Sequence, residues 1–273
     1  MTTDQAKQKL IELFRTNVKG KKADVTGRNA FHDGKEGNWL EEQFGKTPDA
    51  DNHADFWGFE LKNETTSGKT TFGDWSANRY IFKTGQFAQL FKKPTLETPQ
   101  DVFCQFFGKP YPLKNNRCSW SGSPIPHLDK YNAFGQIMII EDNLDIVIIY
   151  SYSKDQREDK SSILPPQLQK DNIELARWFG TTSPSSKRTD KCLREKLEDK
   201  FNQNGWFTCK KDSSGRYNQI CFGSPMNYQS WIQLVKKGVV YFDSGMHQGN
   251  KRPYSEWRAN NDYWDSLIIE KYN

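Results

Sequence analysis

The sequence predicts an α/β or α+β fold, in which a mixed β-sheet is flanked by helices. Two observations support this prediction. Short runs rich in β-branched residues recur along the chain, and the pair in Gly135–Tyr152, joined by a polar turn, is typical of a β-hairpin. In other segments, apolar residues recur three and four positions apart, as on the buried face of a helix. Because one chain contains both patterns, helices packed on a sheet are expected.

Two helices are expected near the start of the chain. Over residues 3–18, apolar residues recur at helical spacing behind a capping residue, either Thr3 or Asp4. A second, shorter helix is expected over Asn38–Phe44, and the glycine after it favours its termination there. Glu41 lies on the flank of the buried face of this helix, from where its carboxylate can reach into a neighbouring cleft.

The segments on either side of the predicted hairpin are less regular. Residues 64–75 are rich in Thr, Ser and Gly. Residues 76–93 indicate an ordinary amphipathic segment, and their basic side chains leave a DNA-contacting surface as the alternative. The prolines of residues 94–134 favour loops with one or two short strands, arranged as a lid or wrapping loop around a ligand. After the hairpin, the charged residues of Ser153–Ser162 indicate a mobile link.

The rest of the chain predicts alternating helices and strands. A seam near residues 153–190 divides a catalytic region, residues 1–152, from a second lobe, residues 153–273, although the two lobes can be interleaved. The expected elements are helices near Asn172–Phe179, Lys191–Asn202 and Met226–Lys237, and strands near Trp206–Lys210, Arg216–Phe222, Val239–Asp243 and Leu267–Glu270.

The composition excludes several classes of protein. The 273 residues carry a net charge of +5, a mild basic excess that fits a nucleic-acid partner but also many proteins without one. The five cysteines are scattered with no C-x-x-C, so a zinc site or a disulfide framework is not expected. The sequence shows no signal peptide and no apolar run of membrane-spanning length, so a cytoplasmic protein with no membrane contact is expected.

The stretch Asp51–Asn63, DNHADFWGFELKN, contains the residues best suited to chemistry. On a strand, alternate side chains share a face, so Glu60 and Lys62 lie together while the apolar residues between them turn to the core. Gly58 allows the chain to bend and brings Asp55 back toward Glu60. The stretch therefore predicts two carboxylates and an ammonium group at one place.

This combination is what metal-assisted hydrolysis of a phosphodiester needs. A divalent ion held by carboxylates offsets the negative charge of the phosphate and lowers the pKa of a bound water. Mg²⁺ prefers oxygen ligands, which Asp55, Glu60 and the backbone carbonyl of Leu61 can provide, and Mn²⁺ is a possible substitute. Lys62 would then hold or help deprotonate the attacking water and stabilise the developing charge.

The spacing D-x4-E-x-K is weak evidence on its own, because charged residues make up 27% of the chain. A solvated strand face bearing a Glu–Lys pair is the simpler explanation of the spacing alone. The alternation of apolar and ionic residues around the motif, together with Glu41 on a preceding helix, favours the catalytic interpretation.

The run from Gly37 to Asn63, GNWLEEQFGKTPDADNHADFWGFELKN, resembles the MvaI/BcnI group of type II restriction endonucleases, in the MutH-like branch of the PD-(D/E)XK nucleases. The metal-binding acids of that group match Asp55 and Glu60, its catalytic lysine matches Lys62, and its helix glutamate matches Glu41. Ala54 replaces the proline of the nominal motif, which leaves the chemistry intact.

The resemblance implies a Mg²⁺-dependent endonuclease that cuts double-stranded DNA at a short, nearly palindromic site of the CC-x-GG kind. It also implies a monomer that wraps duplex DNA between two lobes. If the chain is a restriction enzyme, a companion DNA methyltransferase is expected in the host.

A second stretch near the end of the chain, GMHQGNKRPYSEWRAN, matches a G-x-H-x-G turn followed by basic residues in the same group. Arginine pairs bidentately with guanine, and Gln and Asn pair with adenine, so this stretch predicts a DNA-reading loop. A surface histidine in an ordinary polar loop is the simpler alternative. The predicted DNA-binding residues are His247, Gln248, Asn250, Lys251, Arg252 and Arg258, with Arg28 and Lys69 as further candidates.

Three other functions stay open at this point. A MutH-like nicking or repair endonuclease would use the same chemistry on one strand. A non-catalytic DNA-binding module would use the acidic strand only for structure. An RNA-processing nuclease has little support, because the sequence contains no RRM-type or KH-type signature.

Overall fold

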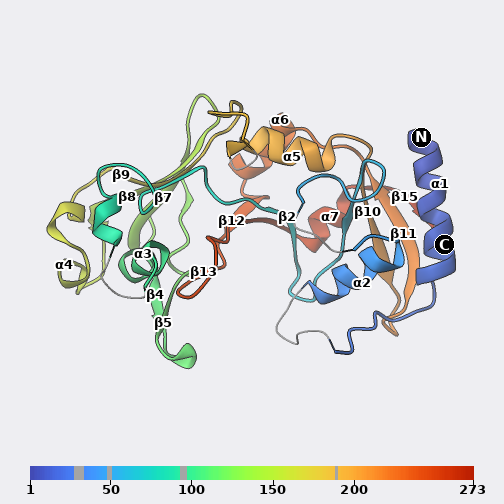
Figure 1. Cartoon of the computed structure of the whole chain (residues 1–273), viewed down its shortest axis with the longest axis horizontal. Coiled ribbons are helices and arrows are strands. Elements are labelled where there is room, and N and C mark those ends of the chain that lie inside the picture. The colour runs from blue at the N-terminus through green and yellow to red at the C-terminus, as the bar shows by residue number, and fades with distance from the viewer. Residues whose placement is uncertain (28–33, 48–50, 93–96, 188–189) are drawn as a thin grey trace. The chain divides into compact units, whose positions relative to one another are not determined.

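The computed structural model describes residues 1–27, 34–47, 51–92, 97–187 and 190–273 (Figure 1). Within these ranges the predicted α/β architecture of sheets flanked by helices is confirmed. The chain forms two compact units, each assembled from separate segments. Unit 1 comprises Met1–Thr70, Lys196–Trp231 and Ala259–Asn273, and unit 2 comprises Thr71–Glu195 and Ile232–Arg258.

These units do not follow the predicted division after residue 152. The chain leaves unit 1 within β2 (Lys69–Asp74) and returns within α5 (Leu193–Phe201). It then passes to unit 2 within α6 (Tyr228–Lys236) and back within β14 (Glu256–Asn260). The units are therefore interleaved in sequence, and the assignment of catalysis to one and DNA recognition to the other stays a prediction.

Unit 1 contains a four-stranded sheet in the order β1-β10-β11-β15. Strand β1 runs parallel to β10, and the remaining neighbours are antiparallel. The parallel register places Glu60 opposite Trp206 and Lys62 opposite Thr208. All four strands were expected from the sequence, and their bounds are β1 Phe59–Lys62, β10 Gly205–Lys211, β11 Tyr217–Gly223 and β15 Ile268–Tyr272.

Two helices share one hydrophobic core with this sheet. Helix α1 (Thr3–Leu13) continues as a π-helical turn over Phe14–Val18, and α2 spans Lys35–Gln43. Thr2, rather than the predicted Thr3 or Asp4, is the N-cap of α1, because its side chain accepts from the backbone N–H of Gln5 in a capping box. The core residues from these helices and the sheet include Leu10, Ile11, Phe14, Trp39, Leu40, Phe44, Phe59, Leu61, Phe207 and Phe222.

Unit 2 contains a five-stranded sheet in the order β3-β9-β8-β7-β6 and a three-stranded sheet in the order β13-β5-β4. The predicted hairpin is confirmed as the antiparallel pair β7 and β8. The bounds are β3 Arg79–Tyr80, β9 Ile173–Trp178, β8 Ile146–Asp155, β7 Phe134–Ile140, β6 His127–Leu128, β13 Met246–His247, β5 Arg117–Trp120 and β4 Lys109–Tyr111.

The remaining elements complete the two units. Strand β12 (Tyr241–Asp243) pairs with β14, which also neighbours β2 in a third small sheet. The other helices are α3 Pro99–Phe107, α4 Lys160–Ile163 and α7 Asn261–Ser266, with 3-10 turns at Ala88–Phe91, Pro112–Lys114 and Pro166–Leu168.

Three predictions for segments of unit 2 are wrong. The segment expected as a helix near Asn172–Phe179 is strand β9, because pairing with β8 overrides the helix preference of its Glu, Leu and Ala residues. Helix α3 lies within residues expected to be mainly loops, capped by Thr98 with Pro99 at its start. The segment expected as a mobile link instead comprises the end of β8 and helix α4, and Arg157 donates to both carboxylate oxygens of buried Asp155.

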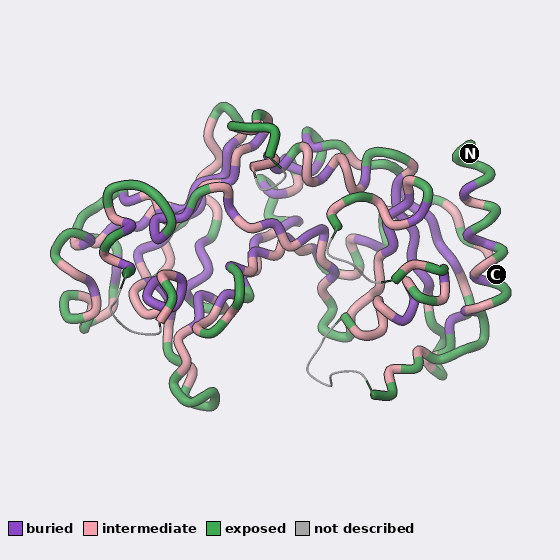
Figure 2. The backbone as a smooth tube through the Cα atoms, in the orientation of Figure 1, coloured by how far each residue is buried: buried purple, intermediate pink, exposed green. Residues whose placement is uncertain are grey.

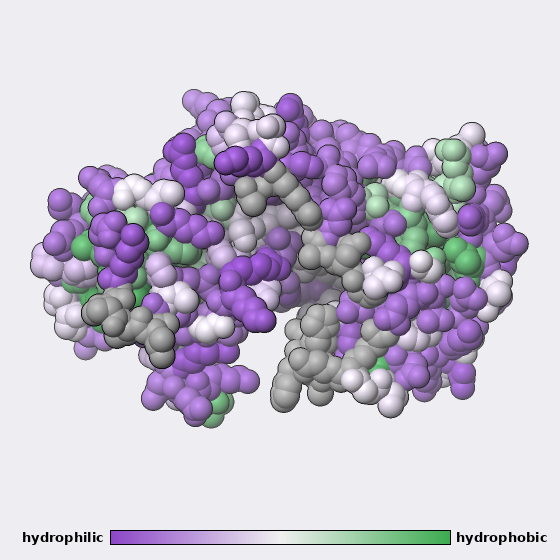
Figure 3. Space-filling view, viewed as in Figure 1, coloured by the Kyte–Doolittle hydropathy of each residue, from purple (hydrophilic) through white to green (hydrophobic). Residues whose placement is uncertain are grey.

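Aromatic side chains fill the interior of unit 2. Trp178 packs edge-on against Phe242 and Trp257, and its indole N–H donates to the carbonyl of Trp75. Phe103 packs at right angles to Trp120 with ring centroids 5.0 Å apart. Buried segments follow the strands of both units (Figure 2), whereas the face in Figure 3 is mostly hydrophilic, as the mean hydropathy of −0.89 predicts. None of the described helices is long and apolar enough for a membrane span.

Candidate active site

A tight turn places Asp55 beside the strand that follows it. Trp57 and Gly58 have φ angles of 48° and 87°, and the backbones of Phe56 and Phe59 exchange two hydrogen bonds of 2.8 and 2.9 Å. Two successive positive φ values are typical of a type I′ turn, for which glycine is well suited. The Oδ2 atom of Asp55 accepts from the backbone N–H of Leu61 at 3.0 Å, so the predicted bend is confirmed.

Glu60 lies at the centre of a buried charge cluster. Its side chain comes from β1 and the residue is only 2% exposed. Its Oε1 atom lies 2.9 Å from Nζ of Lys62 and 2.8 Å from Nζ of Lys200. Its Oε2 atom is buried and has no hydrogen-bond partner among the described residues. The predicted Glu–Lys pair exists, but it is buried, which argues against the alternative of a solvated strand face.

Asp55 belongs to the same cluster. Its Oδ1 atom lies 2.7 Å from Nζ of Lys46, which follows helix α2. Burial raises the pKa of Asp55, but the positive charges of Lys200 and Lys46 outweigh burial and lower the pKa below its usual value. Asp55 is therefore held as a carboxylate, which is the form that a metal ligand requires.

Glu41 joins these two acids from helix α2. Burial, reinforced by the negative charge of Asp55, raises the pKa of Glu41 to about 7. The residue is half-buried, as its predicted position on the flank of the helix implies, and its neighbour Glu42 is exposed. The structure thus brings together all four residues that the sequence nominated for catalysis.

The structure adds two lysines that the sequence did not reveal. Lys200 lies in α5, and the carboxylates of Glu60 and Asp55 more than offset the effect of burial, so that its pKa is raised. Burial lowers the pKa of Lys62, and the charge of Lys200 contributes to the same effect. No spacing rule pointed to Lys46 or Lys200, because both reach the site only through folding. Three acids and three lysines thus form the charge cluster, namely Glu41, Asp55, Glu60, Lys46, Lys62 and Lys200.

The donor set fits a hard divalent cation in part. Asp55 and Glu60 offer carboxylate oxygens, and the unpartnered Oε2 of Glu60 is available for a further interaction. Among the described residues, no group of three or more His, Cys, Asp or Glu side chains is arranged so that it could hold a metal ion by itself. Mg²⁺ usually takes one or two carboxylates and keeps positions for water and phosphate, so an open pair of acids suits it. The predicted contribution of the Leu61 carbonyl stays a prediction.

The predicted DNA-reading turn lies in unit 2, where its polar groups bond to one another. His247 donates its backbone N–H to Oδ1 of Asn250 at 2.7 Å, and its Nε2 lies 3.0 Å from Nδ2 of the same residue. The Oε1 atom of Gln248 accepts from the backbone N–H of Cys118 at 2.6 Å. These three predicted DNA-reading side chains therefore brace the turn and the neighbouring strand β5.

The remaining predicted DNA-binding residues differ in whether their charged groups already pair with acidic side chains. Lys251 is exposed, whereas Arg252 pairs with Asp74 at 2.7 Å and stacks over Tyr254. Arg258 pairs with Glu256 and, at 3.6 Å, with Asp243.

Two further candidates lie elsewhere. Lys69 starts β2, and its carbonyl accepts from the hydroxyl of Thr65. Arg28 lies outside the described residues. Their predicted DNA contacts stay predictions.

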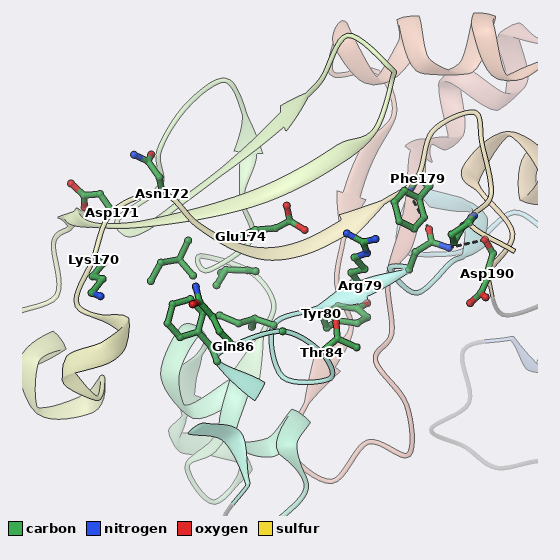
Figure 4. Close-up of a pocket in the computed structure, with 17 residues that line it drawn as sticks. Arg79, Tyr80, Thr84, Gln86, Lys170, Asp171, Asn172, Glu174, Phe179 and Asp190 are labelled. Carbon is green, nitrogen blue, oxygen red and sulfur yellow. Dashed lines mark hydrogen bonds between the residues drawn. The ribbon is translucent and has the colours of Figure 1, made fainter. Parts of the chain in front are cut away.

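A cavity of about 850 Å³ lies within unit 2, lined by β3, β9 and the loop after β3. Figure 4 shows side chains of both charges around it, among them Arg79, Lys170 and Glu174. Arg79 stacks over the ring of Phe179, 5.0 Å from its centroid. None of the described residues that were predicted for catalysis or DNA binding lines this cavity.

The chain resembles known proteins at the level of family, sequence and fold. The model of a family described as LlaMI restriction endonuclease matches residues 18–272. The type II restriction enzyme ScrFI of Lactococcus lactis subsp. cremoris is 61% identical over 264 residues, which are 97% of each chain. A solved complex of the restriction endonuclease MvaI with its cognate DNA substrate is similar in fold, with a TM-score of 0.56, 14% identity and 96% of each chain covered.

Proposed function

Since the chain belongs to the LlaMI restriction endonuclease family, we propose that it is a type II restriction endonuclease that hydrolyses phosphodiester bonds of double-stranded DNA at a short specific site. The full-length similarity to a type II restriction enzyme supports this activity. The observation that carries the catalytic assignment is the joining of Asp55, Glu60 and Lys62 by the turn before β1.

Asp55 and Glu60, with the carbonyl of Leu61, would hold a divalent cation, for which we propose Mg²⁺, with Mn²⁺ as a substitute. Such an ion offsets phosphate charge and lowers the pKa of a bound water. The residues around these two acids prepare the site. The Leu61 N–H and the Lys46 ammonium group fix the Asp55 carboxylate.

Lys62 holds and orients the water that attacks the phosphorus. Its ammonium group is anchored on Glu60 and lies 5.2 Å from the centre of the Phe201 ring, so its position is defined. The pKa of Glu41, about 7, suits proton transfer near neutral pH. Glu41 would act either as a proton acceptor or as a third carboxylate beside the cation.

Lys200 and Lys46 offset the charge of the acids when no cation is bound. Each ammonium group lies on a carboxylate oxygen that a cation would also approach. A divalent ion held by Asp55 and Glu60 would offset the charge that these lysines now balance. Lys200 and Lys46 would then be able to pair with a DNA phosphate and stabilise its negative charge.

The finer features of the activity rest on the resemblance to the MvaI/BcnI group. We propose a nearly palindromic target of the CC-x-GG kind, action as a monomer, a cytoplasmic location, and a companion DNA methyltransferase in the host. The fold similarity to MvaI and the two-unit construction support a related mode of DNA binding.

Incubation of the purified chain with supercoiled plasmid, in Mg²⁺, in Mn²⁺ and in EDTA, tests this proposal. Discrete linear fragments that disappear in EDTA are expected. Accumulation of open circles would instead favour a MutH-like nicking enzyme. Plasmid that is retarded on a gel but uncut under every condition would favour a non-catalytic DNA-binding module.

A further inference from the structure

The structure assigns a second DNA-contacting element, the hairpin of β4 and β5, which spans Lys109–Trp120. This inference rests on the proposed function, because it concerns how the same enzyme recognises its site. We propose that the tip of the hairpin, Leu113–Asn116, enters a groove of the duplex and contributes to sequence recognition. A two-stranded β-ribbon has dimensions that the major groove of B-DNA admits.

The charge of the hairpin suits a polyanion. Residues Lys109–Cys118 include three basic side chains, Lys109, Lys114 and Arg117, and no acidic residue. The tip projects from its sheet and is exposed over Pro112–Asn116 (Figures 1 and 2). Leu113 is 96% exposed, which is unusual for a large apolar residue. In the major groove an apolar side chain can contact the methyl group of thymine.

The amide groups at the tip are available for a ligand. The side chains of Lys114, Asn115 and Asn116 make no hydrogen bond or ion pair to any described residue. Asn115 and Asn116 both have a φ of 54°, so the backbone of the turn presents two consecutive amides in a left-handed conformation. Asparagine pairs bidentately with the edge of adenine, and lysine pairs with guanine or phosphate.

The hairpin is also joined to the turn that the sequence nominated for DNA reading. Strand β5 pairs with β13, with His247 opposite Ser119. Gln248 and Cys118 exchange two hydrogen bonds, one from each backbone N–H. The predicted reading turn thus fixes the base of the hairpin, while the unpaired polar groups lie at its tip.

The position of β4 at the edge of its sheet explains some of the residues of the hairpin without any ligand. Strand β4 is at the edge of its sheet, and lysine and proline on an edge strand, here Lys109 and Pro110, discourage pairing with other chains. This explanation does not extend to the tip, where Leu113 and the two asparagine amides lie beyond the paired residues.

The test replaces the amides without disturbing the turn. In the double variant Asn115→Gly, Asn116→Gly, glycine adopts the positive φ readily, so the fold is retained and thermal melting checks it. Binding is measured by fluorescence anisotropy in EDTA, with a duplex carrying the sequence that the wild-type chain cuts in plasmid DNA and with a scrambled duplex. We expect cognate affinity to fall by about 5- to 100-fold while scrambled binding changes less than about twofold.

A matched pair of lysine variants separates the hairpin from general surface charge. Lys114→Gln is expected to weaken binding to both duplexes. It should also reduce the slope of log affinity against log salt concentration by about one. The control Lys236→Gln removes an equally exposed lysine of unit 2 and should change neither. If the wild-type chain binds DNA and the double glycine variant has the same cognate-to-scrambled affinity ratio, the hairpin inference is wrong but the proposed function stands. Absence of wild-type binding to either duplex would contradict the proposed function itself.

Discussion

The charge cluster of unit 1 and the polar turn of unit 2 satisfy their polar groups in different ways. In the cluster, buried carboxylates face lysines, and Oε2 of Glu60 remains without a partner among the described residues. In the turn, His247, Gln248 and Asn250 bond to backbone and to one another. The proposed function requires the first arrangement to exchange a lysine for another cation, whereas the hydrogen bonds of the second brace the turn. A run of polar residues in a sequence can therefore form either a site for chemistry or a structural turn.

The largest effect is expected at Lys62. Lys62→Ala removes the group that orients the attacking water, so plasmid cleavage should fall by about 10²–10⁴-fold, while binding to the cognate duplex in EDTA stays within a few-fold. The control Lys271→Ala changes an exposed lysine of strand β15 in the same unit and should cut normally. Cleavage by Lys62→Ala at the wild-type rate would show that the cluster is structural, like the turn.

A smaller effect, on stability as well as activity, is expected at Lys200. Lys200→Met leaves Glu60 with Lys62 as its remaining counter-charge, so urea unfolding in EDTA should show a loss of about 1–3 kcal/mol. Saturating Mg²⁺ should recover part of this loss, because a bound cation replaces the missing charge.

The double variant Lys200→Met, Glu60→Gln sharpens this test. If the two residues act together, removing the carboxylate as well should offset much of the destabilisation, which a double-mutant cycle measures. Additive losses would mean that Lys200 does not offset the charge of Glu60, and the proposed exchange of a lysine for a metal ion would be wrong.

At Gln248, stability should change more than recognition. Gln248→Ala leaves the backbone N–H of Cys118 without its acceptor, which costs about 1–2 kcal/mol in the free energy of unfolding. The cognate-to-scrambled affinity ratio, measured well below the melting temperature, should stay within about threefold. An unchanged unfolding free energy together with a collapsed ratio would restore Gln248 as a base-reading residue.

The smallest effect is expected at Arg258. If this arginine reads a guanine edge, as its place in the sequence predicts, Arg258→Ala costs about 1–3 kcal/mol of cognate binding. Its pairing with Glu256 and Asp243 favours a loss below about 1 kcal/mol, measured by anisotropy on the cognate duplex. A loss at the upper end would show that the arginine leaves its carboxylate partners when DNA binds.

The sequence predicted those features that depend on neighbouring residues. The alternation at Glu60 and Lys62, the bend at Gly58 and the helical flank at Glu41 follow from local geometry, and the structure contains all three. The hairpin Gly135–Tyr152 was equally clear, because two β-branched runs and a polar turn are contiguous.

Features that depend on distant partners could not be predicted. Lys200 meets Glu60 across 140 residues of sequence, and in a chain with 39 Lys and Arg residues nothing distinguishes it beforehand. Strand β9 has a helix-favouring composition and extends only because it pairs with β8. The internal bonds of Gln248 likewise required strand β5, more than a hundred residues earlier, to be placed first.

Asp55 provides the most direct test of the central claim that the buried acids of unit 1 form a metal-dependent cutting centre. Asp55→Asn keeps the size of the side chain and its capacity to accept from the Leu61 N–H, but removes the charge that would bind a cation. Supercoiled plasmid is incubated with wild type and Asp55→Asn across a Mg²⁺ titration, with duplex binding measured in parallel. The account predicts fragments from the wild type, none from the variant, and equal DNA binding by both. Cleavage by Asp55→Asn at the wild-type rate and Mg²⁺ concentration would contradict it.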